Sequence, residues 1–192
     1  AIGSSALRIN STGANNTALG LNALYNNTTA SNNTAVGRNA LYTNTTATGN
    51  VALGYYSLFY NTTGASNAAL GYQAMYTNST GCNNVSVGTN SLYANTTASN
   101  NTAVGRDSLR LNTTGTSVTA VGYNALAAHT TGLGNTALGY VAGNTITTGS
   151  FNTSLGYNAQ ASSATAGGEM TLGDANVSNL RCNDTSISSL SD

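Results

Sequence analysis

The chain has 192 residues, and its five arginine or lysine residues balance five aspartate or glutamate residues, so the formal net charge is zero. This balance excludes the charge-driven binding of nucleic acid or of an anionic membrane surface, and we expect neither partner. The apolar runs are far shorter than a membrane span, so we also expect no membrane insertion.

A glycine recurs every seventeen residues along almost the whole chain. The residue before it is always aliphatic, the residue two before it is always small, and a threonine lies nine residues after it from Thr12 to Thr165. Because no repeat gains or loses a residue, the pattern indicates a coil whose turns, or rungs, stack on one another. The glycines are Gly3, Gly20, Gly37, Gly54, Gly71, Gly88, Gly105, Gly122, Gly139, Gly156 and Gly173.

Each rung has two short apolar patches, such as "TAVG" and "NALY", separated by glycine and by Asn/Thr turns. Strands of about 3–5 residues fit these patches, whereas helical repeats need about 33 or more residues. We predict an all-β fold, a parallel β-solenoid or β-roll of about eleven rungs over residues 1–178. Residues at the same place in successive rungs form a column, and we expect the columns of Leu19 and of Leu24 and Leu41 to face inward.

A rung of seventeen residues encloses only a narrow core, which is marginal for one chain alone. The column of small residues two positions before the glycine and a column of aromatic residues also need to be covered by other protein surface. We therefore expect several copies to associate side by side in a fibre closed by cyclic symmetry. The aromatic column consists of Tyr25, Tyr42, Phe59, Tyr76 and Tyr93.

The polar positions of the repeat are filled by uncharged Asn, Thr and Ser, and the chain has neither proline nor lysine. A charge repeated in one column would lie about 4.8 Å from its copy, whereas uncharged side chains can hydrogen-bond to their copies. The many N-x-S/T matches, such as Asn15–Thr17, follow the same period. We interpret them as ladder residues and not as glycan acceptors.

The repeat decays near the C-terminus, where the leucine column reads Gly143, Gln160 and Val177. We expect residues 179–192 to form a capping segment, because an open solenoid end is an exposed strand edge. Cys82 and Cys182 lie nearly six rungs apart, too far for a disulfide within one chain, so we expect both to be free, buried thiols.

The stretch "NNTAVGRNALYTNTT" resembles the head repeats of trimeric autotransporter adhesins, the YadA-like family, and repeats of bacteriophage tail-fibre proteins. The resemblance implies a left-handed parallel β-roll and an obligate homotrimer. The C-terminal stretch "LGDANVSNLRCNDTSISSLSD" is similar to the segment before the intramolecular chaperone of endosialidase-type tail fibres. That similarity implies a processing junction at Ser191 and Asp192.

Residues for catalysis or metal binding are few. The single histidine, His129, falls in a column that reads asparagine from Asn10 to Asn112, and we interpret it as a turn position that accepted a histidine. The carboxylates are scattered, and no pair at a fixed spacing suggests general acid–base chemistry. We therefore expect no enzymatic activity, no cofactor and no metal site.

Tyrosines directly after the glycine are the best candidates for binding at the surface, since tyrosine suits contact with carbohydrate or protein. A stacked aromatic ladder is the alternative interpretation. For the glycines, we expect either a turn with positive φ or a close backbone contact with a neighbouring chain. The candidate tyrosines are Tyr55, Tyr72, Tyr123, Tyr140 and Tyr157.

Together these features favour a structural and adhesive fibre segment, such as a phage tail fibre that takes part in host attachment. A bacterial surface adhesin of the trimeric autotransporter type is a close alternative. Either assignment implies a virion or cell-surface location and a receptor on the host surface, for which carbohydrate is one candidate class. A solenoid that binds ice or another ligand is an alternative of a different class, because threonine recurs in every rung.

Overall fold

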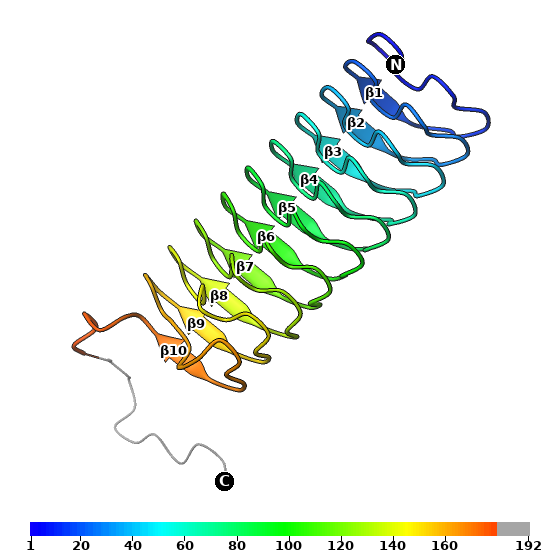
Figure 1. The fold of residues 1–192 in the computed structure, drawn as a ribbon. Helices are drawn as coiled ribbons and strands as arrows, with labels where there is room; N and C mark the ends of the chain where they lie inside the picture. The colour runs from blue at the N-terminus through cyan, green and yellow to red at the C-terminus, as the bar shows by residue number, and fades with distance from the viewer. Residues whose placement is uncertain (180–192) are drawn as a thin grey trace.

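The computed structural model describes residues 1–179 and shows a rod of stacked coils with β1 near one end and β10 near the other (Figure 1). Ten three-residue strands form one parallel sheet in chain order, and no helix, hence none able to cross a membrane, occurs in these residues. The predicted β-solenoid is therefore confirmed. The strands are β1 (Thr17–Leu19), β2 (Thr34–Val36), β3 (Val51–Leu53), β4 (Ala68–Leu70), β5 (Val85–Val87), β6 (Thr102–Val104), β7 (Thr119–Val121), β8 (Thr136–Leu138), β9 (Thr153–Leu155) and β10 (Met170–Leu172).

The register of the sheet repeats the period of the sequence. Ala18 pairs with Ala35, and Ala35 pairs with Ala52, so each residue lies beside its copy seventeen positions later. An isolated bridge between Ile2 and Leu19 extends the same pairing to the first rung. The predicted capping segment (residues 179–192), with Cys182 and the Ser191–Asp192 junction, lies outside the described residues, apart from Asn179.

One prediction about the strands is wrong, because the aliphatic residue before the glycine faces outward. Leu19 is 44% exposed, whereas the small residue before it, Ala18, is 2% exposed. Every strand from β1 to β9 repeats this pattern, with only its middle residue buried. The physical reason is the thinness of the roll. A leucine from the opposite wall fills the interior and leaves room only for alanine, serine or threonine on the strand.

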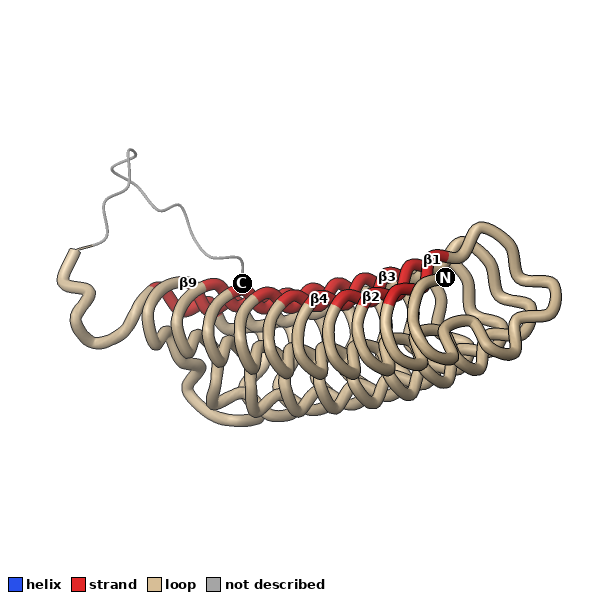
Figure 2. Tube along the Cα trace, turned by 90° about the horizontal axis from the view of Figure 1, so that it is seen from above, coloured by secondary structure: helices blue, strands red, loops and turns tan. Residues whose placement is uncertain are grey.

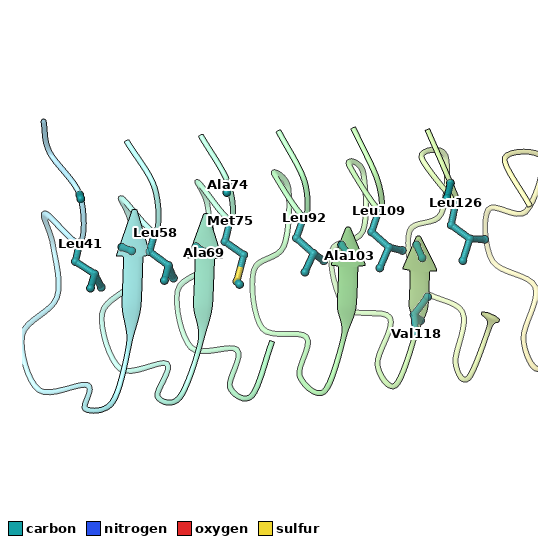
Figure 3. Packing of buried hydrophobic residues seen from close by; sticks show 14 of the residues in the cluster. Leu41, Leu58, Ala69, Ala74, Met75, Leu92, Ala103, Leu109, Val118 and Leu126 are labelled. Atoms are coloured by element: carbon teal, nitrogen blue, oxygen red, sulfur yellow. The ribbon is translucent and has the colours of Figure 1, made fainter. Parts of the chain in front are cut away.

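The opposite wall is the Leu24 column, which faces inward as predicted. Its members from Leu24 to Leu126 are fully buried, and Figure 3 shows those from Leu41 to Leu126 following one another in a row along the rod. Their φ angles are positive, 51° at Leu24 and 49° at Leu126. This conformation costs about 1–2 kcal/mol for a residue with a Cβ atom. Burying a leucine side chain contributes about 1.5–3 kcal/mol, so the burial outweighs the strain.

The glycine column is required by the spacing between rungs of the same chain. Its first ten members have φ between 112° and 144°, so the predicted positive φ is confirmed. At Gly71, an added Cβ atom would lie 2.5 Å from the carbonyl oxygen of Gly88 in the next rung. The Gly88 amide donates a hydrogen bond of 2.8 Å to the Leu70 carbonyl, which holds the two rungs at this distance.

Two asparagine columns satisfy the polar half of the interior. In the first, the Asn44 Nδ2 atom donates to the Asn27 Oδ1 atom at 3.1 Å and to the Ala47 carbonyl at 3.0 Å. In the second, the Asn50 amide donates to the Asn33 Oδ1 atom at 2.9 Å. All four of these asparagine side chains are fully buried. The predicted polar ladder is therefore present, and it lies inside the roll.

Candidate functional site: the outer sheet face and the aromatic columns

The outer sheet face consists of the first and third residues of strands β1–β10, and it is largely apolar. Leu53 and Leu138 are 46% and 52% exposed, and Val51 and Val85 add exposed aliphatic side chains from the first position of their strands. Figure 2 shows the strands following one another along one side of the rod. The described residues therefore present a continuous apolar stripe along the length of the solenoid, and large apolar patches mark interaction surfaces.

The predicted binding tyrosines form two short stacks, and they are also exposed. The ring centres of Tyr55 and Tyr72 are 5.5 Å apart, and the angle between the ring planes is 7°. Tyr123, Tyr140 and Tyr157 continue the column in a second stack, with 5.2 Å between successive rings. Their exposed fractions run from 36% at Tyr55 to 63% at Tyr157. The structure thus combines the two interpretations, since the tyrosines stack on one another and still present their edges to solvent.

An arginine covers the first ring of each tyrosine stack. The Arg38 guanidinium lies 5.7 Å from the Tyr55 ring centre, and the Arg106 guanidinium lies 5.9 Å from the Tyr123 ring centre. Each arginine lies in the same column as the tyrosine that it covers, one rung earlier in the chain. Such cation–π contacts are worth about 0.5–1 kcal/mol at exposed sites, and they fix the arginine over the ring.

A second aromatic column, the five-ring stack, runs from Tyr25 to Tyr93 with 5.1–5.5 Å between successive rings. At its first end, the Arg8 guanidinium lies 5.5 Å from the Tyr25 ring centre and donates a hydrogen bond of 2.7 Å to the Tyr25 hydroxyl. Burial, together with a hydrogen bond to Tyr60, raises the pKa of Tyr76 to about 12. From the sequence, this column is expected only to be covered by a neighbouring copy.

His129 lies in the first asparagine ladder and is fully buried. Its Nε2 atom lies 3.0 Å from the Asn135 Nδ2 atom, which can only donate, so Nε2 must accept. The Nδ1–H group then donates to the Asn112 Oδ1 atom at 3.0 Å. Burial lowers the pKa of His129 to about 4, so the ring is neutral at pH 7 and acts as a substitute for asparagine.

The remaining candidate groups are engaged locally. Asp107 pairs with Arg106 at 3.1 Å and with Arg110 at 3.8 Å. Hydrogen bonds from Ser162 lower the pKa of Glu169. Cys82 is free as predicted, but it is half-buried instead of buried, and its sulfur accepts a hydrogen bond of 3.3 Å from the Ala65 amide. No group of three His, Cys, Asp or Glu side chains that could hold a metal ion occurs in residues 1–179.

Comparison of the chain with protein-family models, with curated proteins and with solved structures finds no match in any of the three. The outward columns are therefore the basis for assigning a function. They present an apolar sheet face, stacked tyrosines capped by arginine, and few charges.

Proposed function

We propose that the chain is a structural and adhesive fibre segment, a homotrimer that belongs to a bacteriophage tail fibre and takes part in host attachment. The outer sheet face is the observation that carries this proposal. An apolar stripe that extends over ten strands needs a partner of equal length and period. A second and third copy of the same rod provide such a partner.

The length of the stripe makes the association favourable. A leucine that is about half exposed gains roughly 1 kcal/mol when its remaining surface is buried. Because only Leu19, Leu53, Leu138 and Leu172 are exposed to this extent, the ten rungs together give about 5–10 kcal/mol for each chain, within the range of the estimated cost of association, about 4–15 kcal/mol. One rung would not hold two chains together, so self-association depends on the unbroken repeat. The number of three copies follows from the resemblance of the repeats to trimeric families.

In this proposal the exposed tyrosine columns provide the surface for a receptor on the host cell. Tyrosine combines an apolar ring with a hydroxyl group, which suits carbohydrate and protein surfaces alike. The fibre is then located on the virion tail, or on the cell surface if the protein is an adhesin of the trimeric autotransporter type. The similarity at the C-terminus supports processing at Ser191–Asp192, with a chaperone encoded beyond it.

A binding assay tests the attachment function. Fluorescently labelled trimer is incubated with a panel of bacterial strains, and phage adsorption to the strains that bind it is measured with and without excess trimer. We expect specific labelling of some strains and reduced adsorption to them. Uniform absence of labelling across the panel contradicts the proposal. The mass of the mature chain expressed from the full gene tests the processing step separately.

Ice binding is the second candidate, and an exposed threonine column favours it. Thr29, Thr46 and Thr63 are exposed in successive rungs. The neighbouring Thr28 hydroxyl donates to the Thr45 carbonyl of the next rung at 3.1 Å, so its column is engaged within the coil. Other outward threonines are the first residues of six strands, and their row is interrupted by Val51, Ala68 and Val85. A gap between the melting and freezing temperatures of ice in a solution of the purified chain would support ice binding, and equal temperatures would exclude it.

A further inference from the structure

A hollow of about 200 Å³ opens beside the five-ring stack, and Gln73, Asn90, Tyr93 and Arg110 line it. These residues come from three successive rungs. Gln73 and Asn90 lie two positions after their glycines, and Tyr93 and Arg110 lie five positions after theirs. The hollow therefore lies between two columns that run side by side along the rod.

A change of residue in the first of these columns accounts for the hollow. One rung before Gln73, the same position holds Tyr56. The Tyr56 ring packs edge-on against Phe59 at 4.9 Å and against Tyr76 at 5.9 Å between ring centres. The shorter amides of Gln73 and Asn90 replace this ring in the next two rungs, and the space beside the stack opens.

Tyr93 is the last ring of the stack, and its far face differs from that of Tyr25, the first ring. One face packs on Tyr76 at 5.3 Å, and the next position of the column is Arg110. Within residues 1–179, no arginine lies over the Tyr93 ring in the way that Arg8 lies over Tyr25. Arg110 lies beside Asp107 instead, with 3.8 Å between its Nε atom and the carboxylate. Tyr93 and Arg110 therefore both line the hollow, where the stack ends.

The charges beside the hollow leave a net positive charge. Arg106 and Arg110 share one carboxylate, that of Asp107, which also accepts a hydrogen bond of 3.1 Å from the Asn90 Nδ2 atom. The Arg110 side chain is 53% exposed, so its guanidinium remains accessible. In a chain with ten charged residues, this cluster is a local feature with its own chemistry.

We propose that the hollow binds one acidic sugar residue of a surface polysaccharide, an inference that rests on the proposed attachment function. The pyranose ring lies against the far face of Tyr93, and its carboxylate pairs with the Arg110 guanidinium. The Gln73 and Asn90 amides provide donors and acceptors for the hydroxyl groups. Sites for drug-sized ligands span about 300–1,000 Å³, so the smaller volume here suits a single sugar ring.

Calorimetry on the complete chain tests this site. The probes are trisaccharides of galacturonate, glucuronate and mannuronate, each compared with its methyl ester, which keeps the ring and removes the charge. We expect at least one acid to bind with a Kd near the millimolar range and its ester to bind at least tenfold more weakly. Arg110→Gln and Tyr93→Ala should each weaken the acid at least tenfold.

Arg8→Gln is the matched control, because Arg8 lies at the other end of the same stack, where the ring is covered. It should leave binding unchanged, and circular dichroism should show that all three variants stay folded. The site is overturned if none of the three acids binds, or if Arg8→Gln weakens binding as much as Arg110→Gln.

Cell binding separates this inference from the function on which it rests. Loss of labelling in Arg110→Gln supports the site as the receptor contact. Equal labelling by wild type and Arg110→Gln overturns this inference and leaves the attachment function standing. If uronate binds in solution but no strain is labelled, the sugar site is supported and the proposed attachment function is contradicted.

Discussion

Replacement of Gly71 by alanine should destabilise the solenoid strongly, because the coils are held closer together there than a Cβ atom allows. The added atom would lie 2.5 Å from the Gly88 carbonyl oxygen, so neighbouring rungs must move apart by several tenths of an ångström. That movement stretches the 2.8 Å hydrogen bond between the Gly88 amide and the Leu70 carbonyl. The φ angle of 144° adds strain for any residue with a side chain.

The two contributions set the size of the effect. Overpacking costs about 1–3 kcal/mol, and a strained φ costs a further 1–3 kcal/mol, which gives about 2–6 kcal/mol in total. The free energy of unfolding falls by about 2 kcal/mol for each molar of urea, so the urea midpoint should fall by about 1–3 M. The measurement is circular dichroism at one fixed protein concentration, since association also affects the midpoint.

Gly49→Ala is the control that isolates the contact. Gly49 also has a positive φ, 71°, but its added Cβ atom would come no closer than 3.6 Å to the Ser66 side chain. Its column already accepts residues with side chains, such as Asn32 at φ 61°. We expect a loss of about 1 kcal/mol or less. Equal midpoints for Gly71→Ala and Gly49→Ala would refute the explanation by rung spacing.

Three further predictions concern single side chains. Leu58→Asn buries an unpaired amide in the core and should lower the free energy of unfolding by about 1–3 kcal/mol per chain in urea titrations; an unchanged midpoint would contradict the inward orientation of Leu58. Leu53→Asn, on the outer sheet face of the same rung, should lower stability only by weakening association, so its effect in urea titrations should shrink on dilution to the monomer, whereas that of Leu58→Asn should not; a loss as large as that of Leu58→Asn at every protein concentration would be evidence against an outward Leu53. The pKa of His129 is lowered from 6.5 to about 4, so the unfolded chain gains its proton first as the pH falls, and stability should drop by up to about 3 kcal/mol between pH 6.5 and pH 4. His129→Asn should remove this loss, and a pH dependence that persists in the variant would assign it to another group.

The sequence predicts the architecture because the period constrains it directly. A repeat of seventeen residues with no insertion allows each coil to lie on its predecessor, and the pairing of Ala18 with Ala35 follows from that count. The inward Leu24 column is also predicted from the sequence, because leucine or methionine recurs at its position in eight successive rungs. Its positive φ is not, because local preference favours glycine or asparagine there, and burial of the leucine overrides it.

The orientation of the strand could not be decided from the alternation of residues alone. Ala18 and Leu19 are both apolar, and a shift of one residue exchanges the two faces of a strand. The thickness of the roll selects the smaller residue for the interior, and that thickness depends on how far the Leu24 side chain reaches across. The same limit applies to the hollow beside Tyr93. Predicting this hollow requires the knowledge that the columns of Tyr56 and Phe59 lie side by side, which the spacing of residues does not reveal.

Native mass spectrometry of the purified chain at micromolar concentration measures its oligomeric state. It therefore tests the proposed homotrimer, in which the outer sheet face is buried between copies of the chain. We predict a species of three times the 19.2 kDa chain mass. The variant Leu53→Asp, which places a charge on that face, should shift the population toward monomer while circular dichroism remains that of a folded solenoid. A wild-type chain that is monomeric at this concentration, with its outer sheet face exposed to water, would contradict the account.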